Sequence, residues 1–154
     1  MQTGKEIQTE IENLETKVIP ETEAALLASA ASFKTDTAGL SEYALIKAKL
    51  DMLKSRLDGL KKEKPLAQLA ALKAEVAEAE RASKEAGVAL KKAYEETKAK
   101  LIPLFGERGC KLEEACETTL LVSEKRRAMN KAFGWYECRM RYAVAWATEN
   151  GLKY

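Results

Sequence analysis

Hydrophobic residues recur at helical spacing along nearly the whole chain, and no segment alternates apolar and polar residues as a β-strand does. Thr3 and Glu6 stand three residues apart ahead of the first apolar positions, which is the sequence form of a capping box. An apolar stripe follows at spacings of four, three and four residues: Ile7, Ile11, Leu14 and Val18. Pro20 either ends this helix or lies in the first turn of the next. We expect the narrow stripe to associate, with a second copy or with another chain.

The middle of the chain has the most regular pattern. Apolar residues alternate spacings of four and three, which is a heptad seam: Ile46, Leu50, Leu53, Leu57 and Leu60. After the segment "GLKKEKP" the same spacing resumes from Leu69 to Thr97, with many Ala and Ser in the seam. Two heptad helices joined by a short Gly/Lys/Pro segment predict an antiparallel hairpin, Leu40–Lys64 against Leu66–Lys100, with its tip near residues 61–65. Since an Ala-rich seam buries little apolar area, this hairpin needs a further helix against it.

Turn-forming residues divide the chain into three segments. "KTDTAG" at Lys34–Gly39 and "IPLFGERG" at Ile102–Gly109 are the expected breaks. The segments are N-terminal helices over 1–33, a helical hairpin over 40–101, and an aromatic and basic helical segment over 110–150. In the last of these Gly134 predicts a kink or a boundary, and "ENG" at Glu149–Gly151 predicts the helix end. The predicted fold is all-α: a coiled-coil-like hairpin with packed N- and C-terminal helices.

The C-terminal stretch "FGWYECRMRYAVAWATENG" is rich in aromatic residues. Six of the ten aromatic residues of the chain lie in the last 22 positions of the sequence. At about 100° per residue, Trp135, Tyr142 and Trp146 fall within roughly 40° of one another, with Arg139 beside them. We call these three rings the aromatic column. A neighbouring set forms a broader core stripe: Met129, Ala132, Phe133, Tyr136, Met140, Ala143, Val144 and Ala147. Two interpretations of the column are open. Either the helix is wedged between two neighbours, or the column faces a protein partner, where Trp, Tyr, Met and Arg are enriched.

Charge adds one alternative. The chain has 26 basic and 24 acidic residues, a net charge of +2, which implies no partner by itself. A local excess of basic residues surrounds the aromatic column, and nucleic-acid contacts would fall to Lys125, Arg126, Arg127, Lys131 and Arg141. These five scatter around the helix, whereas a surface that follows phosphates needs them aligned. Arg127 and Lys131 flank the column, so stacking of bases on it stays a second hypothesis.

Several kinds of chemistry lack their residues. The chain has no histidine and no CxxC pair, and "GERGCK" at Gly106–Lys111 lacks the phosphate-loop pattern. Glu113 and Glu117 stand four residues apart, which is more typical of a solvated helix face than of a carboxylate metal site. We therefore expect no catalytic residue, no metal and no cofactor.

The location follows from the cysteines and the apolar runs. Three cysteines, an odd number, indicate reduced thiols. Neither a membrane-spanning run nor a signal peptide is apparent, so a cytoplasmic protein or a component of an assembled particle is expected, and not a secreted one.

These features together predict a non-catalytic helical interaction or assembly protein that binds protein, either a second copy or another subunit, and no membrane. A structural or accessory subunit of a phage-type or other large assembly is the class that such chains suggest. The alternative is a small nucleic-acid-binding accessory protein that uses the basic and aromatic C-terminal helix.

Overall fold

The computed structural model describes residues 3–32, 37–105 and 110–154. All regular structure in these ranges is helical, so the all-α prediction is confirmed. The chain divides into two compact units, Met1–Ala70 and Ala71–Tyr154. Residues 34–36 of the first expected break and 106–109 of the second lie outside the described ranges. The remaining residues of both breaks belong to one helix, which begins at Thr37 and ends at Phe105.

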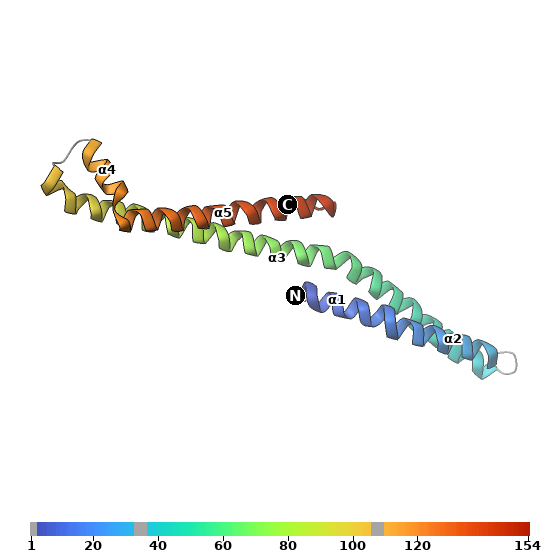
Figure 1. Ribbon diagram of the computed structural model, residues 1–154. Helices are drawn as coiled ribbons and strands as arrows, with labels where there is room; N and C mark the ends of the chain where they lie inside the picture. Colours follow the sequence, from blue (N-terminus) through green and yellow to red (C-terminus); the bar gives the residue numbers. More distant parts are fainter. Residues whose placement is uncertain (1–2, 33–36, 106–109) are drawn as a thin grey trace. The chain divides into compact units, whose positions relative to one another are not determined.

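The first unit pairs the N-terminal helices with the beginning of the long helix α3. It contains α1 (Gly4–Asn13), the π-helix η1 (Leu14–Val18), α2 (Ile19–Ser32) and the part of α3 (Thr37–Phe105) up to Ala70. Gly4 lies beside Gln68, whereas Glu23 forms an ion pair with Lys54, so the N-terminal helices run antiparallel to α3 (Figure 1).

The capping box at the start of α1 is formed as the sequence predicts. The backbone N–H of Thr3 donates to Glu6 Oε2 at 2.7 Å, and the backbone N–H of Glu6 donates to Thr3 Oγ1 at 3.3 Å. The pKa of the Glu6 carboxyl is lowered by the hydrogen bond from the Thr3 backbone N–H first, and by a hydrogen bond from the Thr3 side chain second. Two N–H groups that the helix leaves without an intrahelical partner are thereby satisfied.

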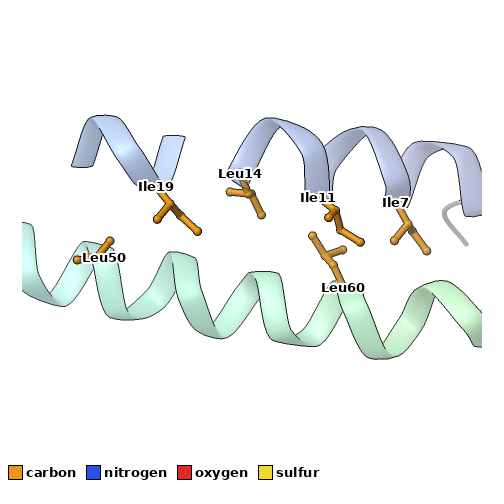
Figure 2. Packing of buried hydrophobic residues seen from close by; sticks show 6 residues of the cluster. All are labelled: Ile7, Ile11, Leu14, Ile19, Leu50 and Leu60. Atoms are coloured by element: carbon orange, nitrogen blue, oxygen red, sulfur yellow. The ribbon is translucent and has the colours of Figure 1, made fainter. Parts of the chain in front are cut away.

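The core of the first unit lies between these antiparallel helices. Ile7, Ile11, Leu14 and Ile19 point toward α3, where they pack against Leu50 and Leu60 (Figure 2). Half-buried Leu53 and Leu57 complete the α3 side, so the predicted heptad seam is the face that α1, η1 and α2 cover. Ion pairs border the core: Arg56–Glu10 at 3.0 Å, Lys61–Glu15 at 2.7 Å and Lys54–Glu23 at 2.9 Å. Because these pairs are solvent-exposed, water and salt screen them, and apolar burial dominates the stability of the unit.

One extra residue in η1 shifts the apolar face of the N-terminal helices. Buried or packed positions run Ile7, Ile11, Leu14, Ile19, Thr22, Leu26 and Ser29, with a spacing of five between Leu14 and Ile19. The Ile19 N–H donates to the Leu14 carbonyl, which is the π-helical hydrogen bond. Val18, the last member of the predicted stripe, is therefore only half-buried, and Ile19 takes its place. Pro20 lies in the first turn of α2, one of the two alternatives that the sequence left open.

The turn that we expected near residues 61–65 is not formed, because α3 continues through this segment without interruption. Pro65 removes one backbone donor, but Lys and Glu before it are good helix formers. Leu60 and Leu69, on either side, are 1% and 7% exposed, so packing continues across the proline and offsets its cost. The helices Leu40–Lys64 and Leu66–Lys100 are thus two parts of one helix and do not fold back on each other.

The second unit pairs the rest of α3 with the C-terminal helices α4 (Cys110–Thr118) and α5 (Leu120–Glu149). Arg139 forms an ion pair with Glu75 at 3.0 Å, and the Lys73 ammonium lies 5.2 Å from the centre of the Tyr154 ring. Arg126, near the start of α5, borders the same groove as Tyr94, so α5 runs antiparallel to this part of α3 (Figure 1). Small residues dominate the buried set: Val76, Ala79, Ala93, Thr97, Leu112, Cys116, Val122, Ala143 and Ala147.

The helix boundary within the C-terminal segment lies at Thr119 and not at Gly134. Gly134 is inside α5, whereas Thr119 has extended backbone angles of φ −63° and ψ 143°. The hydroxyls of Thr118 and Thr119 both donate to carbonyls of the preceding turn, which competes with continuation of the helix.

The predicted helix end at Glu149–Gly151 is confirmed. Gly151 has φ +66°, Leu152 N–H donates to the Ala147 carbonyl, and Gly151 N–H donates to the Thr148 carbonyl. This is the hydrogen-bond pattern of a Schellman motif, in which glycine supplies the left-handed conformation.

Candidate partner-binding surface

Helix α5 buries one face and leaves a second apolar face open. Ala143 and Ala147 of the predicted core stripe are 0% and 1% exposed, and Met129, Tyr136 and Met140 are half-buried. At one border of this stripe Phe133 and Val144 are 48% and 40% exposed, although their positions predicted burial. The stripe is therefore narrower than the sequence suggests, because α3 covers only its centre.

The aromatic column lies at the opposite border of the stripe, and two of its three rings are exposed. Trp135 and Tyr142 are 40% and 54% exposed, and Trp146 is half-buried. Arg139, expected to act with the column, instead forms an ion pair with Glu75 of α3. Of the two interpretations of the column, burial between two neighbours does not describe Trp135 and Tyr142.

The exposed apolar face extends beyond the aromatic residues. Seven exposed residues continue it at alternating spacings of three and four: Ala128, Lys131, Trp135, Cys138, Tyr142, Ala145 and Glu149. We call these seven residues the column face. Its spacing is that of a heptad seam on the side of α5 next to the core stripe. Ala128, Cys138, Ala145 and Glu149 were not predicted from the sequence, because only the aromatic members stand out there, yet the same periodicity identifies all seven.

The residues proposed for nucleic-acid contacts are dispersed, and two of them have carboxylate partners on the same unit. Arg126 pairs with Glu117 at 3.0 Å, and Arg141 lies 3.9 Å from Glu137. Lys125, Arg127 and Lys131 are exposed.

Arg126 also borders an open groove of about 460 Å³ with Tyr94, Lys91, Lys98 and Glu95. Burial of the Tyr94 hydroxyl raises the pKa of this residue, which remains a neutral phenol. The groove therefore combines an aromatic side chain with cations, one of which already has a carboxylate partner.

The N-terminal stripe expected to associate is occupied within the chain. Ile7, Ile11 and Leu14 are between 3% and 6% exposed, since α3 covers them. Exposed apolar residues do remain on the same unit, along one line of α3 at spacings of seven and fourteen residues: Leu45, Met52 and Leu66.

The thiols, metal donors and apolar stretches of the described residues are as follows. Cys116 is buried and Cys138 is exposed, and both are free thiols. Among the residues in the described ranges, no group of three or more Cys, Asp or Glu side chains is placed to hold a metal ion. None of the described helices contains a stretch long and apolar enough to cross a membrane.

Comparison with protein-family models, with curated proteins and with solved structures finds no match to this chain.

Proposed function

We propose that this protein is a non-catalytic helical assembly protein that binds a helix of a protein partner through the column face of α5. The observation that carries the proposal is the exposure of Trp135 and Tyr142 in the middle of a heptad-spaced stripe. Large aromatic side chains lose apolar hydration when a partner covers them, and they are the residues that most often dominate protein interfaces. A partner that is itself a helix matches the spacing of the stripe.

The heptad positions of α3 support a coiled-coil type of packing for this protein. The Leu50, Leu53, Leu57 and Leu60 seam is covered by residues from α1, η1 and α2. The Ala-rich seam that follows lets α5 approach closely, since small side chains occupy the buried positions on both helices. Helices with heptad-spaced residues can pack against helices of other subunits in the same way, which suits a structural or accessory subunit of a larger assembly. Its odd number of cysteines favours a reducing compartment such as the cytoplasm.

A helical protein partner agrees better with the charges than nucleic acid does. A basic surface that neutralises phosphates releases counterions, and its affinity depends on cations free to face the backbone. Here Arg126, Arg139 and Arg141 each lie within 4 Å of a carboxylate of the chain itself. Of the remaining basic residues of α5, Lys125 lies about 160° around the helix from Arg127, so they do not form one continuous track.

The experiment that tests the proposal replaces Trp135 and Tyr142 together with alanine in the full chain at low protein concentration. If the column is a docking surface, the free energy of unfolding falls by less than about 2 kcal/mol, because neither ring fills the core. A buried aromatic residue would cost about 3–5 kcal/mol on its own. Val122→Ala, which removes two methyl groups from a residue of α5 that is 0% exposed, is the control for lost packing.

Two results would contradict the proposal. Unfolding of the double variant would assign the column to the core, and the surface interpretation would fail. Salt-dependent binding of single-stranded DNA or RNA at low ionic strength, abolished by the same double substitution, would replace the protein partner by nucleic acid.

A further inference from the structure

We propose that the occupant of the column face is a second copy of this chain, whose α5 packs antiparallel against the first. The inference rests on the proposed function, because it names the partner of the same surface. The two copies are related by a twofold axis that passes near Met140. Each copy then contributes the same column face, as an isologous interface requires.

The order of large and small residues along the column face is complementary to itself in this orientation. A heptad seam has two kinds of position, a and d. In an antiparallel pair of helices, each a position of one seam lies opposite a d position of the other. With the axis near Met140, Trp135 faces Ala145 of the second copy, and Tyr142 faces Cys138 of the second copy. Beside the seam, half-buried Trp146 faces Ala132 of the second copy. Each ring of the aromatic column thus meets a small side chain, which is the arrangement that fills space without overpacking.

The charged members of the column face support the same register. Lys131 and Glu149 lie in the exposed seam itself, and in the part of the chain that the structure describes neither takes part in an ion pair. In the antiparallel pair Lys131 of each copy faces Glu149 of the other, which gives two ion pairs related by the twofold axis. Opposite charges across a helix seam fix orientation and register more than they add affinity.

The competing arrangements place like residues together or separate the ion pairs. A parallel pair sets Lys131 against Lys131 and Trp135 against Trp135 of the second copy, so the charges repel and the rings collide. An antiparallel pair shifted by one heptad toward the start of α5 brings Glu149 against Glu124 of the second copy, whereas the opposite shift sets Glu149 against Cys138 and separates it from Lys131. The register with the axis near Met140 avoids these conflicts.

Arg139 and Arg141 lie on opposite sides of the twofold axis. Each of them faces the same arginine of the second copy. Arg139 is ion-paired with Glu75 at 3.0 Å, and Arg141 lies 3.9 Å from Glu137. These carboxylates reduce the repulsion between the two copies, and salt screens what remains. The pairing therefore keeps a net attraction from the seam and tolerates the flanking charges.

The test is a charge-reversal cycle on the full chain, with the dissociation constant of the dimer measured by sedimentation equilibrium. Lys131→Glu and Glu149→Lys each create two like-charge contacts, and we expect each to weaken the dimer by about tenfold or more. The double variant carries both reversals, restores the opposite-charge pairs, and should return the dissociation constant to within about threefold of the original. Trp135→Ala should weaken the dimer by at least about tenfold.

Two controls match these changes in residue type and helix. Lys125→Glu reverses a charge of α5 outside the overlap, and Phe133→Ala removes an exposed aromatic residue from the other border of the helix. Neither should change the dissociation constant by more than about twofold. Far-ultraviolet circular dichroism verifies that every variant remains helical.

The outcomes separate the two proposals. A dimer that is weakened by each single reversal and restored by the double variant supports the pairing. A dimer insensitive to Trp135→Ala and to both reversals overturns it, as does a chain that stays monomeric at high micromolar concentration. In either of these cases the proposed function still holds if the Trp135 and Tyr142 alanine variant remains folded. Failure of that variant to fold removes the proposed function and this inference together.

Discussion

Replacing Leu60 by alanine tests the central packing relation of the first unit, in which the N-terminal helices cover the heptad seam of α3. Leu60 is 1% exposed and belongs to the same buried cluster as Ile7, Ile11 and Leu14. The substitution keeps a strong helix former at a helical position, so the loss comes from packing and not from helix propensity. Met52→Ala is the matched control, since Met52 lies in the same helix and is 74% exposed.

The expected loss follows from the atoms removed. Three carbon atoms leave a fully buried site, which at about 0.8 kcal/mol each costs roughly 2.4 kcal/mol in transfer free energy. The cavity left between the helices adds to this, and buried leucine-to-alanine changes cost about 2–5 kcal/mol in total. We therefore expect the free energy of unfolding to fall by about 3 kcal/mol, a large fraction of the roughly 5–15 kcal/mol of a typical domain. Met52→Ala should change it by less than about 0.5 kcal/mol.

Urea unfolding followed by far-ultraviolet circular dichroism measures both variants. Tryptophan fluorescence adds a second probe, because Trp135 and Trp146 both belong to the second unit. If Leu60→Ala costs no more than Met52→Ala, the seam of α3 is not covered by α1, η1 and α2, and the assignment of the core is refuted.

Three further predictions concern local features of the helices. Gly151→Ala should lower the free energy of unfolding by about 1 kcal/mol, because the φ of +66° at this position favours glycine, and thermal unfolding measures the loss. Gly59→Ala should raise it by up to about 1 kcal/mol, since a Cβ at this helical position meets nothing within 4 Å; a decrease would show that glycine is needed there for a contact. Glu6→Ala should destabilise the chain at neutral pH, with a difference from wild type that shrinks on acidification. The pKa of Glu6 is lowered in the fold, so its stabilising effect is present above the unfolded pKa and is lost as the pH falls through the folded one. Urea unfolding at a series of pH values measures this trend, and a difference independent of pH would contradict it.

Features set by a few neighbouring residues could be predicted from the sequence. The capping box of Thr3 and Glu6 and the helix end at Gly151 need only local hydrogen bonds, and both form as expected. The heptad positions from Leu50 to Leu60 identify a buried face, since spacing alone decides which side chains share it.

Features that depend on a balance between distant parts could not be predicted in the same way. Pro65 is a turn signal in isolation, yet packing at Leu60 and Leu69 keeps α3 continuous through it. Val18 fits a regular helix, but the π-turn replaces it with Ile19. For the same reason the periodicity of α5 locates the aromatic column without showing what covers it, and only the exposure of Trp135 and Tyr142 identifies it as a candidate site.

The π-turn of η1 determines where the N-terminal helix can lose a residue without losing its core. In effect it is a single-residue insertion that the N-terminal helix accommodates by widening one turn. Removing one residue between Leu14 and Ile19 would bring these two side chains to a spacing of four, the ordinary spacing of the face they share. The apolar faces before and after the turn would then remain in phase along an uninterrupted α-helix. Deletion at this point is therefore expected to preserve the helical core, whereas deletion within α1 would rotate the capping box away from it by about 100°.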